Sequence, residues 1–134
     1  MKTRRFDHID LRVKDMEKAR DFYGKILPAL GFTCDRSDPK YGSFYAVGGD
    51  RASEFFAFEA DPDHKPNATR IAFWAETRAE VDEFARIANT AGAMNPEGPE
   101  LCAEYSPGYY AFFFEDPDGN KLEICCRESP IIKE

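Results

Sequence analysis

The sequence has no Cys-x-x-Cys pair, although it contains four cysteines. A zinc knuckle needs such paired thiols, and a disulfide framework is not expected in a reducing compartment, so both kinds of site are disfavoured. Two of the cysteines are adjacent, and on a strand they would point to opposite faces. We expect ordinary buried or half-buried thiols at Cys34, Cys102, Cys125 and Cys126.

Positive charge is also scarce, because 18 Lys and Arg residues stand against 25 Asp and Glu residues and the net charge is −7. Nucleic acids and anionic lipid surfaces attract clustered cations, so neither is expected as a partner. No apolar run approaches the length that crosses a membrane, and the basic residues 1–7 lack the apolar region of a signal peptide. We therefore expect a cytoplasmic protein.

The motifs of covalent and nucleotide chemistry are missing as well. The sequence contains no nucleophile elbow, phosphate-binding loop or redox dithiol. What it does contain is an apolar fraction of 43% and an aromatic fraction of 14% in 134 residues. This composition predicts a packed globular protein, either one domain or two small modules that share a core.

One pattern occurs twice along the chain. An alternating strand around His8 leads into a helical run, and the same order follows Arg70. Internal repeats matter for the fold prediction, because equivalent positions of two packed modules face each other. The two equivalent residues differ in chemistry, since one is a histidine and the other an arginine.

In the first half, strands are predicted at residues 6–13, 32–36, 43–48 and 54–59. Asp15 is the expected N-cap of the helix between the first two strands, and Pro28 and Gly31 should mark its end. The apolar stripe of this helix consists of Ala19, Phe22, Tyr23, Ile26, Leu27 and Leu30.

Residues 61–67, which are polar and include two prolines, form the predicted linker. Beyond it, strands are predicted at residues 69–75, 102–105, 109–115 and 121–127, with a turn at residues 116–120. Thr77 and Glu80 form a capping box, and Gly92 should close the second helix. The order βαβββ, written twice, predicts an α+β fold with a mixed sheet and the helices on one face.

Alternation sorts the residues of each strand into two faces. Apolar residues such as Ile9 and Ile71 belong to the face that the helices should cover. The opposite face is either solvated, as antiparallel sheets allow, or the wall of a small-molecule pocket. Aromatic residues on both faces at residues 109–114 favour the pocket. The polar side chains of this face are His8, Asp10, Arg12, Arg70, Trp74 and Glu123.

On these residues the chain resembles the vicinal oxygen chelate superfamily, which comprises glyoxalases, bleomycin resistance proteins and extradiol dioxygenases. The matching segments are residues 8–13, 19–23, 30–32, 71–73, 109–112 and 116–123, of which Asp-Pro-Asp-Gly-Asn-Lys-Leu-Glu is the most specific. The resemblance implies one domain over residues 1–134, built of two βαβββ modules at about residues 5–60 and 68–127 that form a curved sheet or open barrel with the helices outside. It also implies a homodimer.

Metal-dependent members of this family hold a divalent ion with His, Gln and Glu ligands. The resemblance gives His8 and Glu123 both ligand and catalytic roles, and Glu54 is the candidate for the first-module glutamate, within a residue or two of register. Arg70 stands where the second-module histidine would be, and arginine has no free lone pair for a metal. Arg70 either pairs with Glu123 in place of the ion or turns aside. The implied ion is Zn, Ni, Mn or Fe.

Further residues of the predicted polar face are candidates for binding a substrate. Arginines on this face of an acidic protein suggest an anionic ligand, unless they pair with Asp10, Glu54 or Glu123. Aromatic residues could stack on a planar ligand or could pack in the core. The candidates for substrate binding are Arg12, Arg70, Asp10, Trp74, Tyr45, Tyr109 and Tyr110.

Two functional hypotheses follow. The first, to which we give preference on the sequence, is a lyase, isomerase or dioxygenase that acts on an oxygen-chelating substrate through an atypical metal site. The second is a metal-free protein of the bleomycin-resistance type that sequesters a small anionic or aromatic molecule. His8 and Glu123 favour the enzyme, and Arg70 favours the binding protein.

Overall fold

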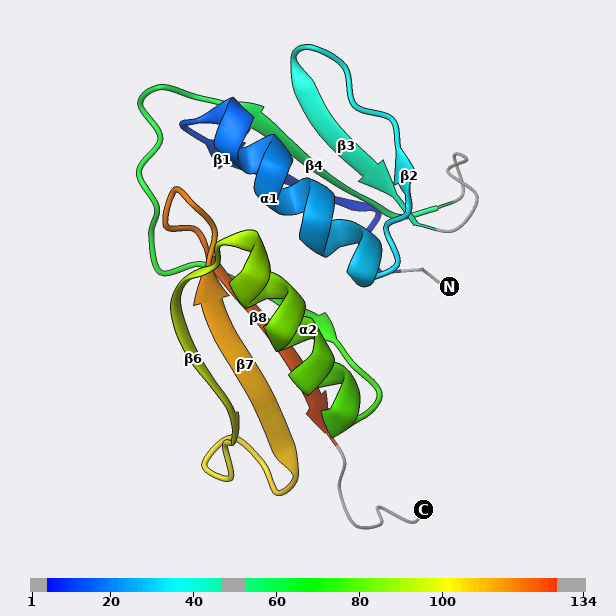
Figure 1. The fold of residues 1–134 in the computed structure, drawn as a ribbon, viewed down its shortest axis with the longest axis vertical. Helices are drawn as coiled ribbons and strands as arrows, with labels where there is room; N and C mark the ends of the chain where they lie inside the picture. The colour runs from blue at the N-terminus through cyan, green and yellow to red at the C-terminus, as the bar shows by residue number, and fades with distance from the viewer. Residues whose placement is uncertain (1–4, 47–52, 128–134) are drawn as a thin grey trace. The chain divides into compact units, whose positions relative to one another are not determined.

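The computed structural model describes residues 5–46 and 53–127. The chain divides into two compact units, Met1–Lys65 (unit 1) and Pro66–Glu134 (unit 2), and each is described by itself. Within the described residues, each unit contains one helix and four strands in the order βαβββ, which confirms the predicted α+β fold with two tandem modules (Figure 1).

Unit 1 consists of β1 (His8–Val13), α1 (Met16–Ala29), β2 (Cys34–Asp35), β3 (Tyr41–Tyr45) and β4 (Phe55–Ala60). Its sheet has the strand order β1-β4-β3-β2. The β1–β4 pair is parallel, whereas β4–β3 and β3–β2 are antiparallel, so the sheet is mixed.

Unit 2 consists of β5 (Arg70–Trp74), α2 (Arg78–Ala91), β6 (Met94–Leu101), β7 (Tyr109–Glu115) and β8 (Lys121–Arg127). Its strand order is β5-β8-β7-β6, with a parallel β5–β8 pair and two antiparallel pairs. Both units therefore have the same topology, and each first strand lies beside the last strand of its own unit.

The helices begin at the predicted caps. The Asp15 side chain accepts a hydrogen bond from the Lys18 backbone N–H at 3.0 Å, and the Thr77 hydroxyl accepts one from the Glu80 N–H at 3.1 Å. Gly92 ends α2 in the left-handed conformation, with φ of 104°. In α1, Pro28 lies inside the last turn, and the helix ends at Ala29 before Gly31.

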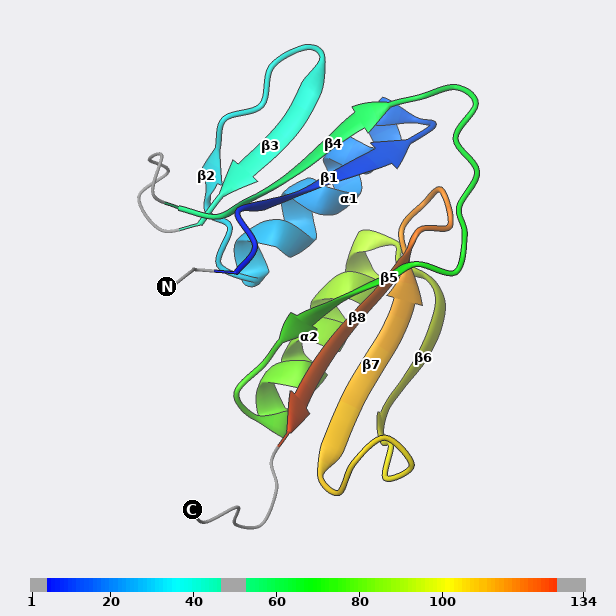
Figure 2. The same ribbon diagram turned by 180° about the vertical axis from the view of Figure 1, so that it is seen from behind.

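Each helix covers one face of the sheet of its own unit, in front of the sheet in Figure 1 and behind it in Figure 2. In unit 1, the Tyr23 ring packs on Phe56 and Phe58, all fully or almost fully buried. In unit 2, Phe84 of α2 packs against Phe114 at 5.8 Å between ring centroids. We call the opposite face of each sheet its second face.

One predicted strand is wrong. Residues 102–105 form a turn, and the second strand of unit 2 is β6, which lies in the Pro- and Gly-containing stretch at Met94–Leu101. This strand is at the edge of the sheet, and its pairing with β7 shifts register at two places. Proline is tolerated in a strand at a sheet edge or at a bulge. The prediction was wrong because it took these prolines as a sign that the stretch is not a strand.

Smaller differences concern strand lengths. Only Cys34 and Asp35 of the predicted strand at 32–36 pair in β2, and β3 begins at Tyr41 rather than at Ser43. The end of the strand predicted at 43–48 lies outside the described residues. No helix in the described part of the chain is long and apolar enough to cross a membrane.

Candidate functional site

Three rings form a row across the second face of unit 1. His8 of β1 pairs in register with Phe55 of β4, and Phe55 pairs with Tyr45 of β3. The His8 and Phe55 rings stack at 4.4 Å between centroids, and the Phe55 and Tyr45 rings stack at 4.5 Å. Two predicted site residues, His8 and Tyr45, thus lie on either side of a phenylalanine that the sequence analysis did not single out.

A carboxylate orients the His8 ring. Its Nδ1 lies 2.7 Å from Asp7 Oδ2, and both side chains are partly exposed. A carboxylate at one ring nitrogen is the usual arrangement behind a ligating or proton-transferring histidine, because it fixes the tautomer and leaves the other nitrogen outward. His8 is therefore in a chemically usable orientation.

The predicted ligand-binding residue Arg12 has carboxylate partners within unit 1. Its Nη1 donates to Asp10 Oδ1 at 2.7 Å, and its Nη2 lies 3.4 Å from Glu59 Oε1. The hydrogen bond to Asp10 raises the pKa of Arg12 above its ordinary value. Arg12 and Asp10 thus neutralise each other, which weakens the case for Arg12 as an anion receptor.

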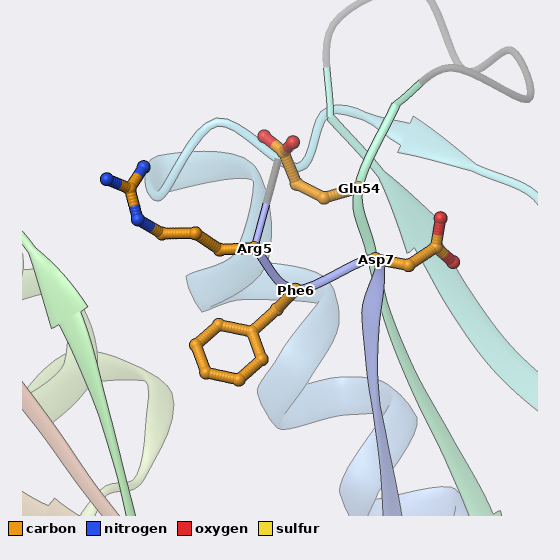
Figure 3. A pocket seen from close by; sticks show the side chains of 4 residues that line it. All are labelled: Arg5, Phe6, Asp7 and Glu54. Carbon is orange, nitrogen blue, oxygen red and sulfur yellow. The ribbon is translucent and has the colours of Figure 1, made fainter. Parts of the chain in front are cut away.

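Glu54 lies at a different place from the His8 ring row. Glu54 directly precedes Phe55, whose ring stacks on His8 on the second face of unit 1. Because successive side chains of an extended chain point to opposite sides, Glu54 points away from the second face. It lines a pocket of about 200 Å³ with Arg5, Phe6 and Asp7 (Figure 3). In that view the Glu54 and Asp7 side chains point in different directions.

The strand register identifies the true counterpart of Glu123 in unit 1. In unit 2, Arg70 pairs with Lys121, and Glu123 lies two residues further along β8. In unit 1, His8 pairs with Phe55, and the residue two further along β4 is Ala57. The repeat therefore has alanine, not Glu54, where a first-module glutamate would stand.

Glu123 is buried on the second face of unit 2, with 5% of its surface exposed. The Tyr109 hydroxyl donates a hydrogen bond to Glu123 Oε2. Burial is the main cause that raises the pKa of Tyr109 well above its ordinary value, and hydrogen bonding with Cys125 and Glu123 raises it further. Tyr109 therefore remains a neutral hydroxyl donor to Glu123 throughout the physiological range.

Two thiols lie beside this pair in a small cluster with Tyr109 and Ala111, against which Phe113 packs. Burial is the main cause that raises the pKa of Cys102 and of Cys125. Raised values keep the thiols protonated, and a neutral thiol is a poor nucleophile and metal ligand. These cysteines therefore serve as packing groups, and all four cysteines of the chain are thiols.

Arg70 turns toward an aromatic ring. Its guanidinium lies 4.9 Å from the centroid of Phe113, which pairs in register with Glu123. Together with Lys121, Glu97 and other residues of β6 and β7 it lines a pocket of about 60 Å³. The structure records Tyr109, not Arg70, as the hydrogen-bonding partner of the Glu123 carboxylate.

The two adjacent tyrosines of β7 face opposite sides of the sheet. Tyr109 lies on the second face, whereas the Tyr110 hydroxyl donates to Asp82 of α2 at 2.7 Å. Arg78 of the same helix lies over the Tyr110 ring at 5.3 Å. Tyr110 therefore belongs to the contact between sheet and helix, away from the other candidates.

Trp74 and Arg127 meet on the second face of unit 2. Trp74 is 76% exposed, and the Arg127 guanidinium lies 6.0 Å from its centroid and 4.7 Å from that of Tyr109. Arg127 was missed by the sequence analysis. Strand alternation could have found it, because it follows Glu123 and Cys125 at spacings of two on the same face.

The residues at the repeat positions do not meet the needs of a divalent ion. A catalytic site uses three protein ligands with an open position. Among the described residues, no three His, Cys, Asp or Glu side chains form such a group. At the repeat positions, unit 1 has His8 and Ala57 and unit 2 has Arg70 and Glu123, so each unit carries one ligating side chain there. The ligand set does not fit a catalytic ion.

The sequence of this chain matches a known protein superfamily. The sequence model of the Glyoxalase/Bleomycin resistance protein/Dioxygenase superfamily matches residues 5–124. The chain is 29% identical over 124 residues to the uncharacterized protein YqjT of Bacillus subtilis (strain 168), covering 87% of this chain and 94% of that one.

Solved structures share the fold. A glyoxalase/bleomycin resistance protein from Albidiferax ferrireducens T118 superposes with a TM-score of 0.71 at 22% identity, covering 91% of this chain and 98% of the other. The fosfomycin resistance protein FosX from Mesorhizobium loti gives a TM-score of 0.65 at 15% identity, covering 93% of both chains. At these identities the likeness supports the fold alone.

Proposed function

Because this chain belongs to the Glyoxalase/Bleomycin resistance protein/Dioxygenase superfamily, we propose that it binds a small molecule without a divalent metal. Superfamily members bind small molecules and commonly use divalent metals, so binding without a metal would depart from the common pattern of the superfamily. The observation that carries it is the strand register, which assigns Ala57 and Arg70 to two of the four repeat positions. Neither side chain can ligate a metal.

The binding surface that we favour is the second face of unit 2. It combines a buried acceptor, Glu123, with aromatic walls at Tyr109 and Phe113 and with the cation of Arg70 above Phe113. A few fixed polar groups among aromatic side chains are typical of small-molecule sites. A ligand that donates a hydrogen bond could compete with Tyr109 for Glu123, which gives the buried carboxylate a function beyond packing.

A second candidate is a superfamily enzyme, a lyase, isomerase or dioxygenase. The observation in its favour is the Asp7–His8 contact of 2.7 Å, because a carboxylate that orients imidazole is common behind both ligands and general bases. Glu123 would be its second functional group. Two ligating side chains still fall short of the usual three, and this deficit is why we rank the enzyme second.

The proposal includes a cytoplasmic homodimer. Four cysteines in the thiol form suit a reducing compartment, and superfamily members often form dimers.

Elemental analysis tests the metal-independent function. Purified, untagged protein would be incubated with Zn²⁺, Ni²⁺, Mn²⁺ and, anaerobically, Fe²⁺, and the bound metal would be measured after removal of the free ion. We expect far less than one ion per chain, since His8 and Glu123 are the two of the four repeat positions with ligating side chains. Near-stoichiometric metal that both His8→Ala and Glu123→Ala abolish would contradict the proposal and favour the enzyme.

A further inference from the structure

We propose that Arg127, Trp74 and Tyr109, with Tyr105 beside them, bind a small planar aromatic carboxylate. The inference rests on the proposed function, because it names the class of molecule that the second face of unit 2 receives. It adds Arg127 and Tyr105, two residues that neither the repeat nor the family resemblance indicates.

Register brings the three main residues together on one face. Tyr109 of β7 pairs directly with Arg127 of β8, and Trp74 of β5 pairs with Cys125, two residues before Arg127. Trp74 and Arg127 are therefore diagonal neighbours, which long side chains can bridge. The guanidinium carbon lies 4.7 Å from the Tyr109 centroid and 6.0 Å from the Trp74 centroid, both within cation–π range.

The hydrogen-bonding capacity of Arg127 is largely unused within the described residues. Its recorded polar contact is from Nη1 to Ser106 Oγ at 3.4 Å, longer than an ordinary N–H···O bond. By contrast, Arg12 and Arg86 each have a carboxylate at 2.7 Å or less. A guanidinium has five N–H donors in a planar fork that matches a carboxylate, so Arg127 can accept an anionic partner.

The aromatic surface beside Arg127 is accessible. Trp74 is 76% exposed, and Tyr105, which meets the Tyr109 ring edge-on at 5.3 Å, is 63% exposed. A planar ring placed on Trp74 would remove apolar surface from water while its carboxylate reached the guanidinium fork. An aliphatic carboxylate lacks the ring and a neutral arene lacks the charge, so the site should favour molecules with both.

The chain contains a single tryptophan, so its fluorescence reports on Trp74 alone. Benzoate is the probe, and benzamide and acetate are the controls for charge and for the ring. We expect saturable quenching by benzoate, with benzamide and acetate at least about tenfold weaker, because each lacks one of the two contacts. The titrations use the full chain with and without EDTA.

Arg127→Gln should weaken benzoate binding by about tenfold or more, since it removes the charge-assisted contact. Arg86→Gln is the matched control, because Arg86 is an exposed arginine of α2 that pairs with Glu83, and it should leave the affinity unchanged. Circular dichroism would establish that both variants are folded.

Three results would overturn the ligand class: equal quenching by benzoate and benzamide, equal benzoate affinity of wild type and Arg127→Gln, or no saturable quenching by benzoate. In the last case, a Trp74 emission that shifts with protein concentration would mean that a second copy of the chain covers Trp74. Quenching that EDTA abolishes would instead contradict the metal-independent function, while the Arg127→Gln comparison would still decide the ligand class.

Discussion

The Gly42→Ala variant is expected to lose about 3 kcal/mol of unfolding free energy, the upper end of the usual cost of overpacking a core. A Cβ atom at Gly42 would lie 2.1 Å from Phe58 Cζ and 2.3 Å from Phe58 Cε2. The Phe58 ring cannot easily yield, because it is fully buried and packs on Tyr23 at 4.9 Å between centroids. Relief would require movement of β3 or of α1.

Gly24→Ala is the matched control for this variant. Gly24 lies inside α1, and a Cβ there would meet nothing within 4 Å. Alanine in place of glycine in a helix interior stabilises by roughly 0.5–1 kcal/mol, so the two substitutions should have opposite signs. Urea unfolding of both variants provides the measurement. Equal stability of Gly42→Ala and wild type would refute the packing of Phe58 over Gly42.

The Gly42→Ala substitution would also affect the candidate site. Gly42 and Tyr45 lie on the same strand, and Tyr45 is in register with Phe55 and, through it, with His8. A displaced β3 would disturb the row of three rings. The contact of Phe58 with Gly42 on the helix side thus supports the geometry of the second face.

Asp116→Ala is expected to cost about 3 kcal/mol, because a fully buried carboxylate with several donors would be lost. Asp116 Oδ1 accepts from the backbone N–H groups of Asp118 and Asn120 at 2.9 and 3.0 Å, and Oδ2 accepts from Asn120 Nδ2 at 2.8 Å. With alanine, these donors would remain at a buried turn without this acceptor.

Asp38→Ala offers a comparison in another Asp-Pro turn. Asp38 Oδ1 also accepts two backbone hydrogen bonds, from Lys40 and Tyr41 at 2.9 and 2.7 Å, but Asp38 is exposed. Water can replace an exposed acceptor, so the loss should be clearly smaller than that of Asp116→Ala. Thermal unfolding of the two variants tests this difference, and equal losses would argue against the burial account.

The Asp116 turn joins β7 to β8 and so fixes their register. That register places Phe113 opposite Glu123 and Tyr109 opposite Arg127. The most specific part of the family resemblance, Asp-Pro-Asp-Gly-Asn, therefore has a structural role. Its link to function is indirect, because it positions the residues that face the ligand.

Local patterns predicted much of the fold. Asp15 and Thr77 cap their helices as expected, and the strands at residues 109–115 and 121–127 have the predicted bounds. Where the prediction failed, at β6, prolines and glycines were taken as a loop signal. Tertiary context decided otherwise, because an edge strand leaves N–H groups unpaired and so accommodates proline.

The candidate site was harder to predict from the sequence, because the sequence does not give the register between strands. Strand alternation separates Tyr109 from Tyr110, but it does not reveal which residues of two strands are paired. Only the pairing of His8 with Phe55 identifies Ala57, and not Glu54, as the counterpart of Glu123. This register moves our preference from the metal-dependent enzyme to metal-independent binding.

The measurement that tests this account most directly is the zinc and nickel content of the wild-type protein, taken beside that of the His8→Ala and Glu123→Ala variants. Neither unit offers more than one ligating side chain at its two repeat positions, since unit 1 has His8 and Ala57 and unit 2 has Arg70 and Glu123. We predict far less than one ion per chain in wild type and no further loss in the two variants. Close to one ion per wild-type chain that either substitution abolishes would contradict metal-independent binding.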